Sequence, residues 1–91
     1  MIKSFKNKGL KNFFETGSQK GIQPKHSSKL ARILDRLDAS TEVNDMKLPG
    51  YRLHPWKGSI SLWLVDVSGN WRVVFKFEEN HAYVVDYLDP H

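Results

Sequence analysis

Cysteine is absent from this chain, and its absence excludes disulfide bridges, thiolate nucleophiles and cysteine-based metal sites. Such a composition is typical of proteins of a reducing cytosol. Long apolar runs are missing too, since no stretch approaches the roughly 20 apolar residues of a membrane helix. The N-terminal segment contains lysines but no apolar core of signal-peptide length. We therefore expect a soluble, cytoplasmic protein with no membrane partner.

The apolar content is nevertheless sufficient for one small core. The chain has 91 residues, of which 40% are hydrophobic and 12% aromatic, and this size corresponds to a single domain over residues 1–91. Charge is unevenly distributed, with nine Lys or Arg and two acids in residues 1–36 but five and eight in residues 37–91. A basic half of this kind indicates a polyanionic partner, most simply a nucleic acid.

Two helices are predicted in the first half. Asn7 is a suitable N-cap for the first, Gly17 is a suitable stop, and Pro24 suits the first turn of the second. The second helix has apolar residues at three- and four-residue spacing: Leu30, Ile33, Leu34 and Leu37. A basic ridge follows the same spacing on a neighbouring face: Lys25, Lys29, Arg32 and Arg36. This ridge is either a solvated face or a nucleic-acid contact.

The second half alternates with a period of two, which is typical of strands. After a connector with one helical turn at Val43–Met46, candidate strands cover residues 51–54, 60–67, 71–77 and 82–88, and residues 2–5 are a candidate edge strand. Short turns join the last three strands into an antiparallel meander. The predicted fold class is α+β, with two N-terminal helices packed on one face of a small antiparallel sheet.

The register of the last two strands predicts where the polar side chains point. In 71–77, Trp71 and every second residue after it form a core face, whereas Arg72 and Lys76 point to a solvated face. If the next turn pairs residue 77 with residue 82, Arg72 lies opposite Tyr87. Asp89 and His91 then continue on the same cationic face, and a turn of the other parity would reverse this.

A second cluster surrounds a proline. His54 and Lys57 flank Pro55 at the end of a short strand, where proline makes a rigid exit from the sheet. Together with Arg72, Asp89 and His91 they supply two proton-transfer groups, two cations and a carboxylate. No phosphate-binding glycine loop or metal motif accompanies them, so neither a metal nor another cofactor is expected.

This set of side chains suits cleavage of RNA without a metal ion. A base takes the proton of the ribose 2′-hydroxyl, which attacks the adjacent phosphorus. Lys and Arg offset the charge that grows on the phosphate oxygens, and an acid protonates the leaving 5′-oxygen. Histidine can serve at either end, because its pKa lies near neutral pH.

The chain resembles the HigB-type toxins, the host-inhibition branch of the RelE/ParE toxin superfamily. The resemblance rests on "MIKSFKNKGLKNFFETG", "LDAST", "LPGYRLHPWKG", "SGNWRVVF" and "YLDPH", in that order. It implies a toxin that binds the ribosomal decoding site and cleaves mRNA there. It also implies an inhibitory antitoxin with a helix-turn-helix domain, through which alone operator DNA would be bound.

The resemblance also assigns roles to individual residues. His54 and Lys57 match the family's His-Pro-x-Lys-Gly motif, Arg72 matches Asn-Trp-Arg, and Asp89 and His91 match the ends of the terminal Asp-Tyr-His. By this analogy His91 and Asp89 activate the 2′-hydroxyl, and His54 is the acid. Lys57 and Arg72 then stabilise the transition state.

Two departures from the family pattern bear on activity. Pro90 occupies the place where the family has tyrosine, and Trp56 or Tyr87 could stack on a base instead, contributing ~1–3 kcal/mol. The segment after Lys57-Gly58 is one residue short and lacks an acidic-basic pair. These departures favour a second hypothesis, a non-catalytic binder such as a gyrase inhibitor or a degenerate toxin. A third is a small basic RNA-binding domain.

The remaining histidine and tryptophan side chains are not expected to act in catalysis or RNA binding. His26 and His81 are expected at the surface, because polar residues in turns and helix starts are usually exposed. Trp63 and Trp71 are expected in the core because of their strand context.

Deleting only Pro90 and His91 should leave the fold intact, because the predicted core lies upstream of them, and should abolish toxicity. Circular dichroism and thermal unfolding check the fold, and growth after induced expression checks toxicity. A truncated chain that still arrests growth would contradict the role of the terminal histidine.

Overall fold

Both ends of the first helix are determined by single residues. The Asn7 side-chain oxygen accepts a hydrogen bond from the Leu10 N–H at 3.0 Å, which caps α1 (Lys8–Thr16) at its start. The helix ends at Gly17, whose φ of 81° lies in the left-handed region that glycine adopts without strain. The predicted cap and stop are both confirmed.

The second helix is built on its apolar stripe. Pro24 opens a 3₁₀ turn, Pro24–His26, that leads directly into α2 (Ser27–Ala39). All four predicted apolar positions of α2 have no exposed surface: Leu30, Ile33, Leu34 and Leu37. The predicted turn at Val43–Met46 is a second 3₁₀ turn. Periodicity therefore identified correctly the face of α2 that enters the core.

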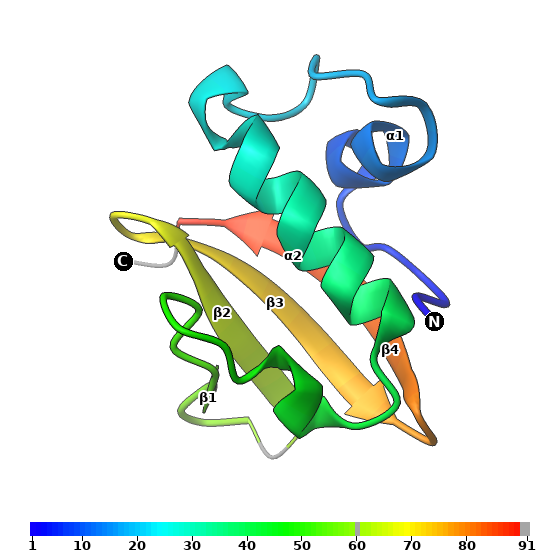
Figure 1. Cartoon of the computed structure of the whole chain (residues 1–91), viewed down its shortest axis with the longest axis vertical. Coiled ribbons are helices and arrows are strands. Elements are labelled where there is room, and N and C mark those ends of the chain that lie inside the picture. The colour runs from blue at the N-terminus through cyan, green and yellow to red at the C-terminus, as the bar shows by residue number, and fades with distance from the viewer. Residues whose placement is uncertain (60, 90–91) are drawn as a thin grey trace.

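The computed structural model describes residues 1–59 and 61–89 and has the predicted α+β architecture (Figure 1). Four antiparallel strands follow one another in the sheet: β1 (His54–Pro55), β2 (Leu62–Ser68), β3 (Trp71–Glu78) and β4 (His81–Leu88). In Figure 1, α2 lies in front of β4 and runs beside β3, and α1 lies beside α2 on the side away from β2. No helix in the described residues is long and apolar enough to cross a membrane.

The N-terminal segment runs parallel to β4 along its outer edge. Ile2 bridges to Ala82 and Phe5 bridges to Val85, and backbone hydrogen bonds such as Lys6 N–H to the Val85 carbonyl, at 2.9 Å, join the two segments. The predicted edge strand is thus present as an irregular pairing. It covers backbone groups of β4 that would otherwise be open to another chain.

The predicted strand at residues 51–54 is wrong, because β1 is only two residues long. Arg52 has a φ of 49°, which breaks the extended conformation immediately before His54. Pro55 is tolerated in β1 because this strand lies at the edge of the sheet, where a missing N–H leaves no ladder bond unmade.

The predicted pairing of Arg72 with Tyr87 is also wrong, although the turn pairs Phe77 with Ala82 as expected. Between these points Phe75 faces two residues of β4, Val84 and Val85, and this bulge shifts the register by one. Arg72 therefore pairs with Leu88, and Tyr87 turns toward the helices.

The bulge in β4 carries visible strain. Val84 has a φ of 48°, in a region that a β-branched residue rarely occupies. Its side chain is 42% exposed, so it contributes little to the core. The Val84 N–H donates to the Ser4 hydroxyl at 2.8 Å, which holds the bulge against the N-terminal segment.

Replacing Val84 by glycine should therefore stabilise the fold. A left-handed conformation costs an L-residue about 1–2 kcal/mol, and glycine loses about 0.5–1 kcal/mol more backbone entropy on folding. We expect the free energy of unfolding, measured with urea, to rise by about 0.5 kcal/mol. Val85→Ala, next to it in the buried core, should instead lower it by about 1–2 kcal/mol. A Val84→Gly variant with a lower free energy of unfolding would contradict the interpretation that Val84 is strained.

Candidate active site

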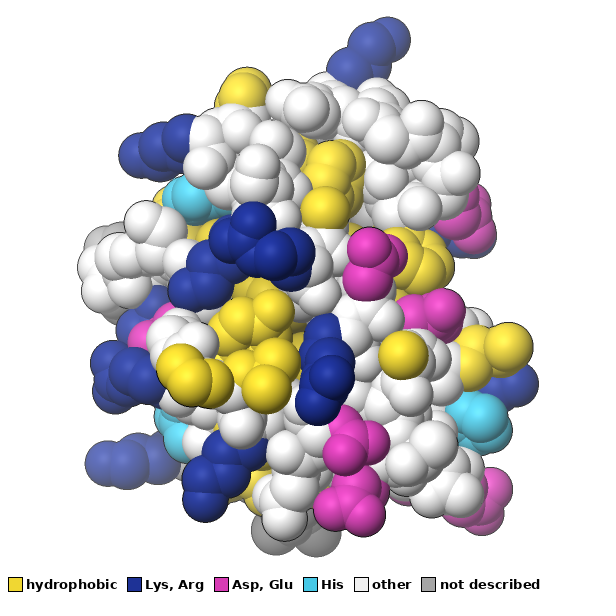
Figure 2. Space-filling view, in the orientation of Figure 1, with side chains coloured by type: hydrophobic (Ala, Val, Ile, Leu, Met, Phe, Trp, Pro, Cys, Tyr) yellow, Lys and Arg dark blue, Asp and Glu magenta, His cyan; other side chains and the backbone are white. Residues whose placement is uncertain are grey.

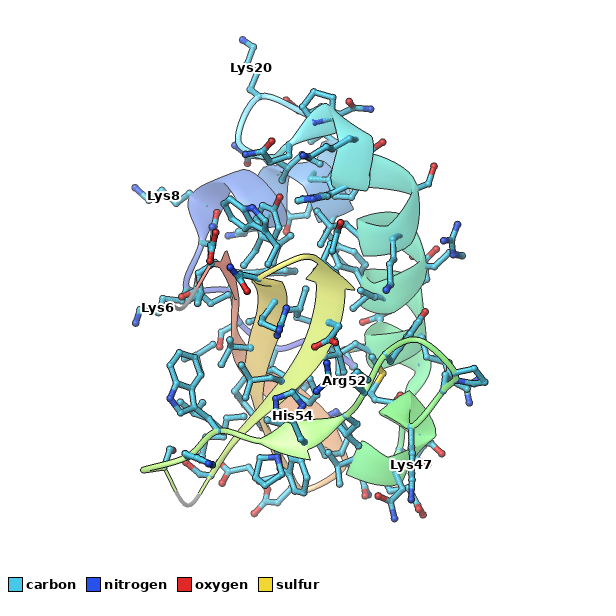
Figure 3. All side chains as sticks on the ribbon, turned by 90° about the vertical axis from the view of Figure 1, so that its left-hand side faces the viewer. Lys6, Lys8, Lys20, Lys47, Arg52 and His54 are labelled. Carbon is cyan, nitrogen blue, oxygen red and sulfur yellow. The ribbon has the colours of Figure 1, made fainter. Side chains whose placement is uncertain are left out.

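A cleft of about 520 Å³ opens beside β1, on the side of the molecule that faces the viewer in Figure 3. It is lined by His54, Pro55, Trp56, Lys57, Leu64 and Arg72. Four of these six residues were predicted to act in catalysis or RNA binding. The fold therefore brings together side chains that come from β1, the loop after it and β3.

Strand pairing explains why these residues meet. His54 pairs with Leu64 of β2, and Leu64 pairs with Val74 of β3, so all three lie on the sheet face opposite the helices. Leu64 and Val74 are only 6% and 4% exposed. The sheet face that was predicted to be solvated therefore includes two buried apolar side chains, because neighbouring segments cover part of this face.

The His54 ring is oriented by its own main chain. Its Nδ1 is hydrogen-bonded to the Arg52 carbonyl oxygen. Since a carbonyl can only accept, Nδ1 carries the proton of this bond. Nε2 is then the nitrogen that can exchange a proton with a ligand, so His54 can serve as acid or base according to its charge.

The Arg72 guanidinium is held from two sides. Its Nε lies 3.0 Å from a carboxylate oxygen of Asp66, and its Nη1 donates to the carbonyls of Gly69 at 2.7 Å and Trp71 at 3.0 Å. The Arg72 side chain is only 18% exposed. These contacts reduce its freedom before any ligand binds, which lowers the entropic cost of an ordered phosphate contact.

Asp66 is a site residue that the sequence interpretation missed. Its second carboxylate oxygen lies 3.2 Å from Arg52, so one acid is shared by two arginines and this group keeps a net positive charge. A simple two-residue turn would pair Val67 with Arg72. A bulge in β2 pairs Asp66 with Arg72 instead, and only this irregularity reveals the contact.

The loop after β1 presents Lys57 to solvent. The Trp56 N–H donates to the Leu62 carbonyl at 2.9 Å, which closes the loop. Gly58 within it has a φ of 86°. Trp56 is partly buried and Lys57 is exposed, so an aromatic face and an ammonium group stand side by side in the cleft lining.

The predicted tail residues are only partly within the structure. Asp89 directly follows Leu88, the partner of Arg72, and is partly buried. Because the register is shifted, the argument that Tyr87, Asp89 and Arg72 share one face no longer holds. His91 and Pro90 lie outside the described residues, so their assigned roles stay predictions.

Tyr87 and His26 both differ from prediction. Tyr87 is 5% exposed, and its ring stacks on Trp71 with centroids 4.7 Å apart, so it is not available to stack on a base. His26, expected at the surface, is 3% exposed and its Nδ1 lies 2.6 Å from the Tyr87 hydroxyl. Trp71 is packed against the core as predicted.

Two of the four basic side chains of the α2 ridge form hydrogen bonds within the chain. Lys29 donates to the Gly50 carbonyl at 3.1 Å, and Arg36 donates to the Asp45 carbonyl at 2.9 Å. These two cations therefore fasten the connector to α2. Lys25 and Arg32 are both exposed.

Charge is unevenly spread over the helix-bearing face. In Figure 2, Lys and Arg gather mainly on the left, the side of the cleft, whereas acids lie mainly to the right. Figure 3, which views the molecule from that side, shows Arg52 and His54 near the middle, Lys6 and Lys8 at the left margin and Lys20 at the top. On the sheet face opposite the helices, Lys76 forms an ion pair with Glu78 at 3.6 Å.

Within the described residues, no three His, Asp or Glu side chains are placed to hold a metal ion.

Comparison with known proteins gives matches along nearly the whole chain. Residues 3–91 match the HigB-like toxin family, described as the RelE-like toxin of type II toxin-antitoxin system HigB. The chain is 39% identical over 92 aligned positions to Endoribonuclease HigB of Proteus vulgaris, with both proteins covered completely. An uncharacterized protein of Haemophilus influenzae is 32% identical over 92 positions, which cover 96% of this chain and 88% of that protein.

The buried His26–Tyr87 pair predicts how stability depends on pH. Burial, followed by the Lys25 charge, lowers the pKa of His26 below 6.5. Below about pH 6.5 the unfolded chain therefore binds more protons at this residue than the folded one, and the free energy of unfolding falls. Burial raises the pKa of Tyr87 above 10.0, so stability also falls when the pH rises above that value.

Urea unfolding from pH 4.5 to 11 checks this dependence. His26→Asn should flatten the loss of stability between about pH 4.5 and 6.5, because asparagine does not titrate. Asp45, whose pKa is lowered by hydrogen bonds from the Thr41 and Glu42 N–H groups, titrates below 3.8, outside this range. Equal acid-side slopes in the wild type and in His26→Asn would contradict the assignment.

Proposed function

The chain belongs to the RelE-like HigB toxins of type II toxin–antitoxin systems, and we propose that it is a ribosome-dependent endoribonuclease that cleaves mRNA without a metal ion. The endoribonuclease activity is supported by the full-length similarity to Endoribonuclease HigB of Proteus vulgaris. The observation that carries the proposal is the cleft in which His54, Lys57 and Arg72 converge from separate segments.

The cleft has the charge that a phosphodiester requires. Arg72 is fixed by Asp66, Gly69 and Trp71, so its guanidinium is preorganised rather than free to reorient. Lys57 adds an exposed ammonium group from the loop after β1. Groups of this kind act most strongly on a transition state, in which negative charge grows on the non-bridging oxygens of the phosphate.

Proton transfer completes the reaction. The 2′-hydroxyl loses its proton and attacks phosphorus, and the 5′-oxygen leaves with a proton supplied by an acid. His54 serves as the acid through Nε2, because its Nδ1 proton is engaged with the Arg52 carbonyl. Asp89 and His91 serve on the 2′-hydroxyl side, a role supported by the resemblance of the terminal residues to the family's Asp-Tyr-His.

RNA contacts outside the reacting phosphate come from aromatic and basic side chains. Trp56 lines the cleft and is the aromatic residue placed to stack on a base there. Lys25 and Arg32 are the ridge cations for which the phosphate backbone is the proposed partner. Lys29, Arg36 and Lys76 have contacts within the chain and are secondary contributors.

Type II systems pair a toxin with an antitoxin, and the partner we propose here is a helix-turn-helix protein that inhibits the toxin. Operator DNA is bound through this antitoxin alone. The ribosomal decoding site presents the mRNA to the cleft, and the protein acts in the cytoplasm.

Alanine substitution of Arg72 or Lys57 tests the proposal on programmed ribosomes with end-labelled mRNA. Each substitution should lower the cleavage rate by about 100-fold or more, the usual loss when one preorganised charge is removed from a transition state. Lys11→Ala, which removes an equally exposed lysine from α1, is the matched control for net charge and should cleave normally.

Two results would overturn parts of the proposal. Full cleavage by Arg72→Ala would contradict the assignment of the cleft. A wild-type toxin that binds the antitoxin but leaves mRNA intact would instead favour the non-catalytic binder, and replication arrest without loss of translation would identify gyrase as its target.

A further inference from the structure

His26 is a buried polar residue that the proposed reaction does not use. It is 3% exposed, and its Nε2 is buried without a hydrogen-bond partner among the described residues. A buried nitrogen left unpaired costs about 1–3 kcal/mol. An apolar side chain of similar size would avoid this cost, so the histidine must be explained by what its other nitrogen does.

Its other nitrogen makes a directional contact with the last strand. Nδ1 lies 2.6 Å from the Tyr87 hydroxyl, and the Gln23 N–H approaches the same oxygen at 3.4 Å. Because the Gln23 N–H can only donate, the Tyr87 oxygen accepts from it, and the Tyr87 O–H is free to donate to Nδ1. The start of α2 is thereby tied to the end of β4 across 61 residues of sequence.

Aromatic packing and a cap strengthen the same connection. The Trp71 and Tyr87 rings stack at 4.7 Å, and the His26 ring packs against both at 5.7 and 5.9 Å. The Asn7 side chain, which caps α1, also donates to the Tyr87 carbonyl at 3.2 Å. Both helix starts therefore contact one residue of β4.

The strained bulge in β4 is what makes the contact possible. Without the extra residue opposite Phe75, Tyr87 would point to the open sheet face, as the sequence pattern predicted. The bulge places Val84 at a φ of 48° and turns Tyr87 toward His26. Strain of this kind persists only where surrounding contacts hold it, and it is found most often beside functional sites.

Both residues in the stack are direct neighbours of the Arg72–Leu88 pair. Trp71 precedes Arg72 in β3, and its carbonyl accepts a hydrogen bond from the Arg72 guanidinium at 3.0 Å. Tyr87 precedes Leu88, the partner of Arg72, and lies two residues before Asp89. A shift of the Trp71–Tyr87 stack would therefore move the main chain that carries the cationic and carboxylate side chains.

We propose that His26 is a positioning residue for RNA cleavage, which acts from the opposite face of the sheet by holding Tyr87, and with it the ends of β3 and β4. The inference rests on the proposed endoribonuclease function. It assigns to the His26–Tyr87 hydrogen bond an effect on the rate of the chemical step rather than on RNA binding, because neither side chain lines the cleft.

Single-turnover cleavage on programmed ribosomes tests this inference with four variants. Tyr87→Phe keeps the stacked ring and loses the hydroxyl, and His26→Leu keeps the bulk and loses the acceptor. Each should slow cleavage roughly tenfold, the equivalent of one hydrogen bond, with an unchanged half-saturating toxin concentration. His26→Asn places an acceptor oxygen near the position of Nδ1 and should cleave at nearly the wild-type rate.

The fourth variant separates positioning from stability. Ile33→Val shortens a fully buried side chain of the same helix and should lower the melting temperature without slowing cleavage. Rates that follow the melting temperature across all four variants would overturn the inference, as would normal cleavage by Tyr87→Phe.

Amide hydrogen exchange gives a second readout that does not depend on activity. Residues 86–89 should exchange faster in Tyr87→Phe than in the wild type, while β2 should be unchanged. If the wild type fails to cleave RNA, the proposed function is wrong, and unchanged exchange at residues 86–89 would then separately refute the positioning role.

Discussion

The pairing of Phe75 with two residues of β4 determines which side chains of the last strand enter the core. Up to the bulge, every second residue of β4 points to the core, beginning with the buried Ala82. After it the alternation is reversed, so Val85 and Tyr87 enter the core and Leu88 joins Arg72 on the open face. A strand shifted by one residue exchanges its two faces. The burial of Tyr87 thus depends on one local irregularity.

One face of the sheet forms the hydrophobic core, and the other forms the cleft. The face under the helices buries the apolar residues of α2 together with Val65, Val73 and Phe75, none of which has exposed surface. On the opposite face Leu64 and Val74 are buried, and His54, Lys57 and Arg72 line the cleft beside them. One carboxylate shared by Arg52 and Arg72 allows two guanidinium groups to lie close together without full repulsion. The positive charge that remains is what an RNA phosphate would meet.

The elements and the core of α2 could be predicted from the sequence because they follow local rules. The Asn7 cap, the Gly17 stop and the apolar period of α2 each depend on a few neighbouring residues. His54, Lys57 and Arg72 were selected because they offer the groups that RNA cleavage needs and because their segments resemble a known family. The structure adds that His54, Lys57 and Arg72 lie around one cavity.

What the sequence could not reveal depends on tertiary contacts. The bulges that pair Asp66 with Arg72 and turn Tyr87 inward are set by hydrogen bonds to distant segments, such as Val84 to Ser4. His26 lies in a basic, polar stretch that has the pattern of a surface, and only its packing against Trp71 and Tyr87 buries it. Neither periodicity nor residue type carries that information.

In the proposed reaction, the cleft beside β1 receives the reacting phosphate. A structure of the ribosome-bound protein with an mRNA that lacks the attacking 2′-hydroxyl tests it most directly. We expect the phosphate that follows the modified nucleotide to lie within hydrogen-bond distance of Lys57 and Arg72, and a base to stack on Trp56. An mRNA that follows the basic ridge of α2 and leaves this cleft without a phosphate would contradict it.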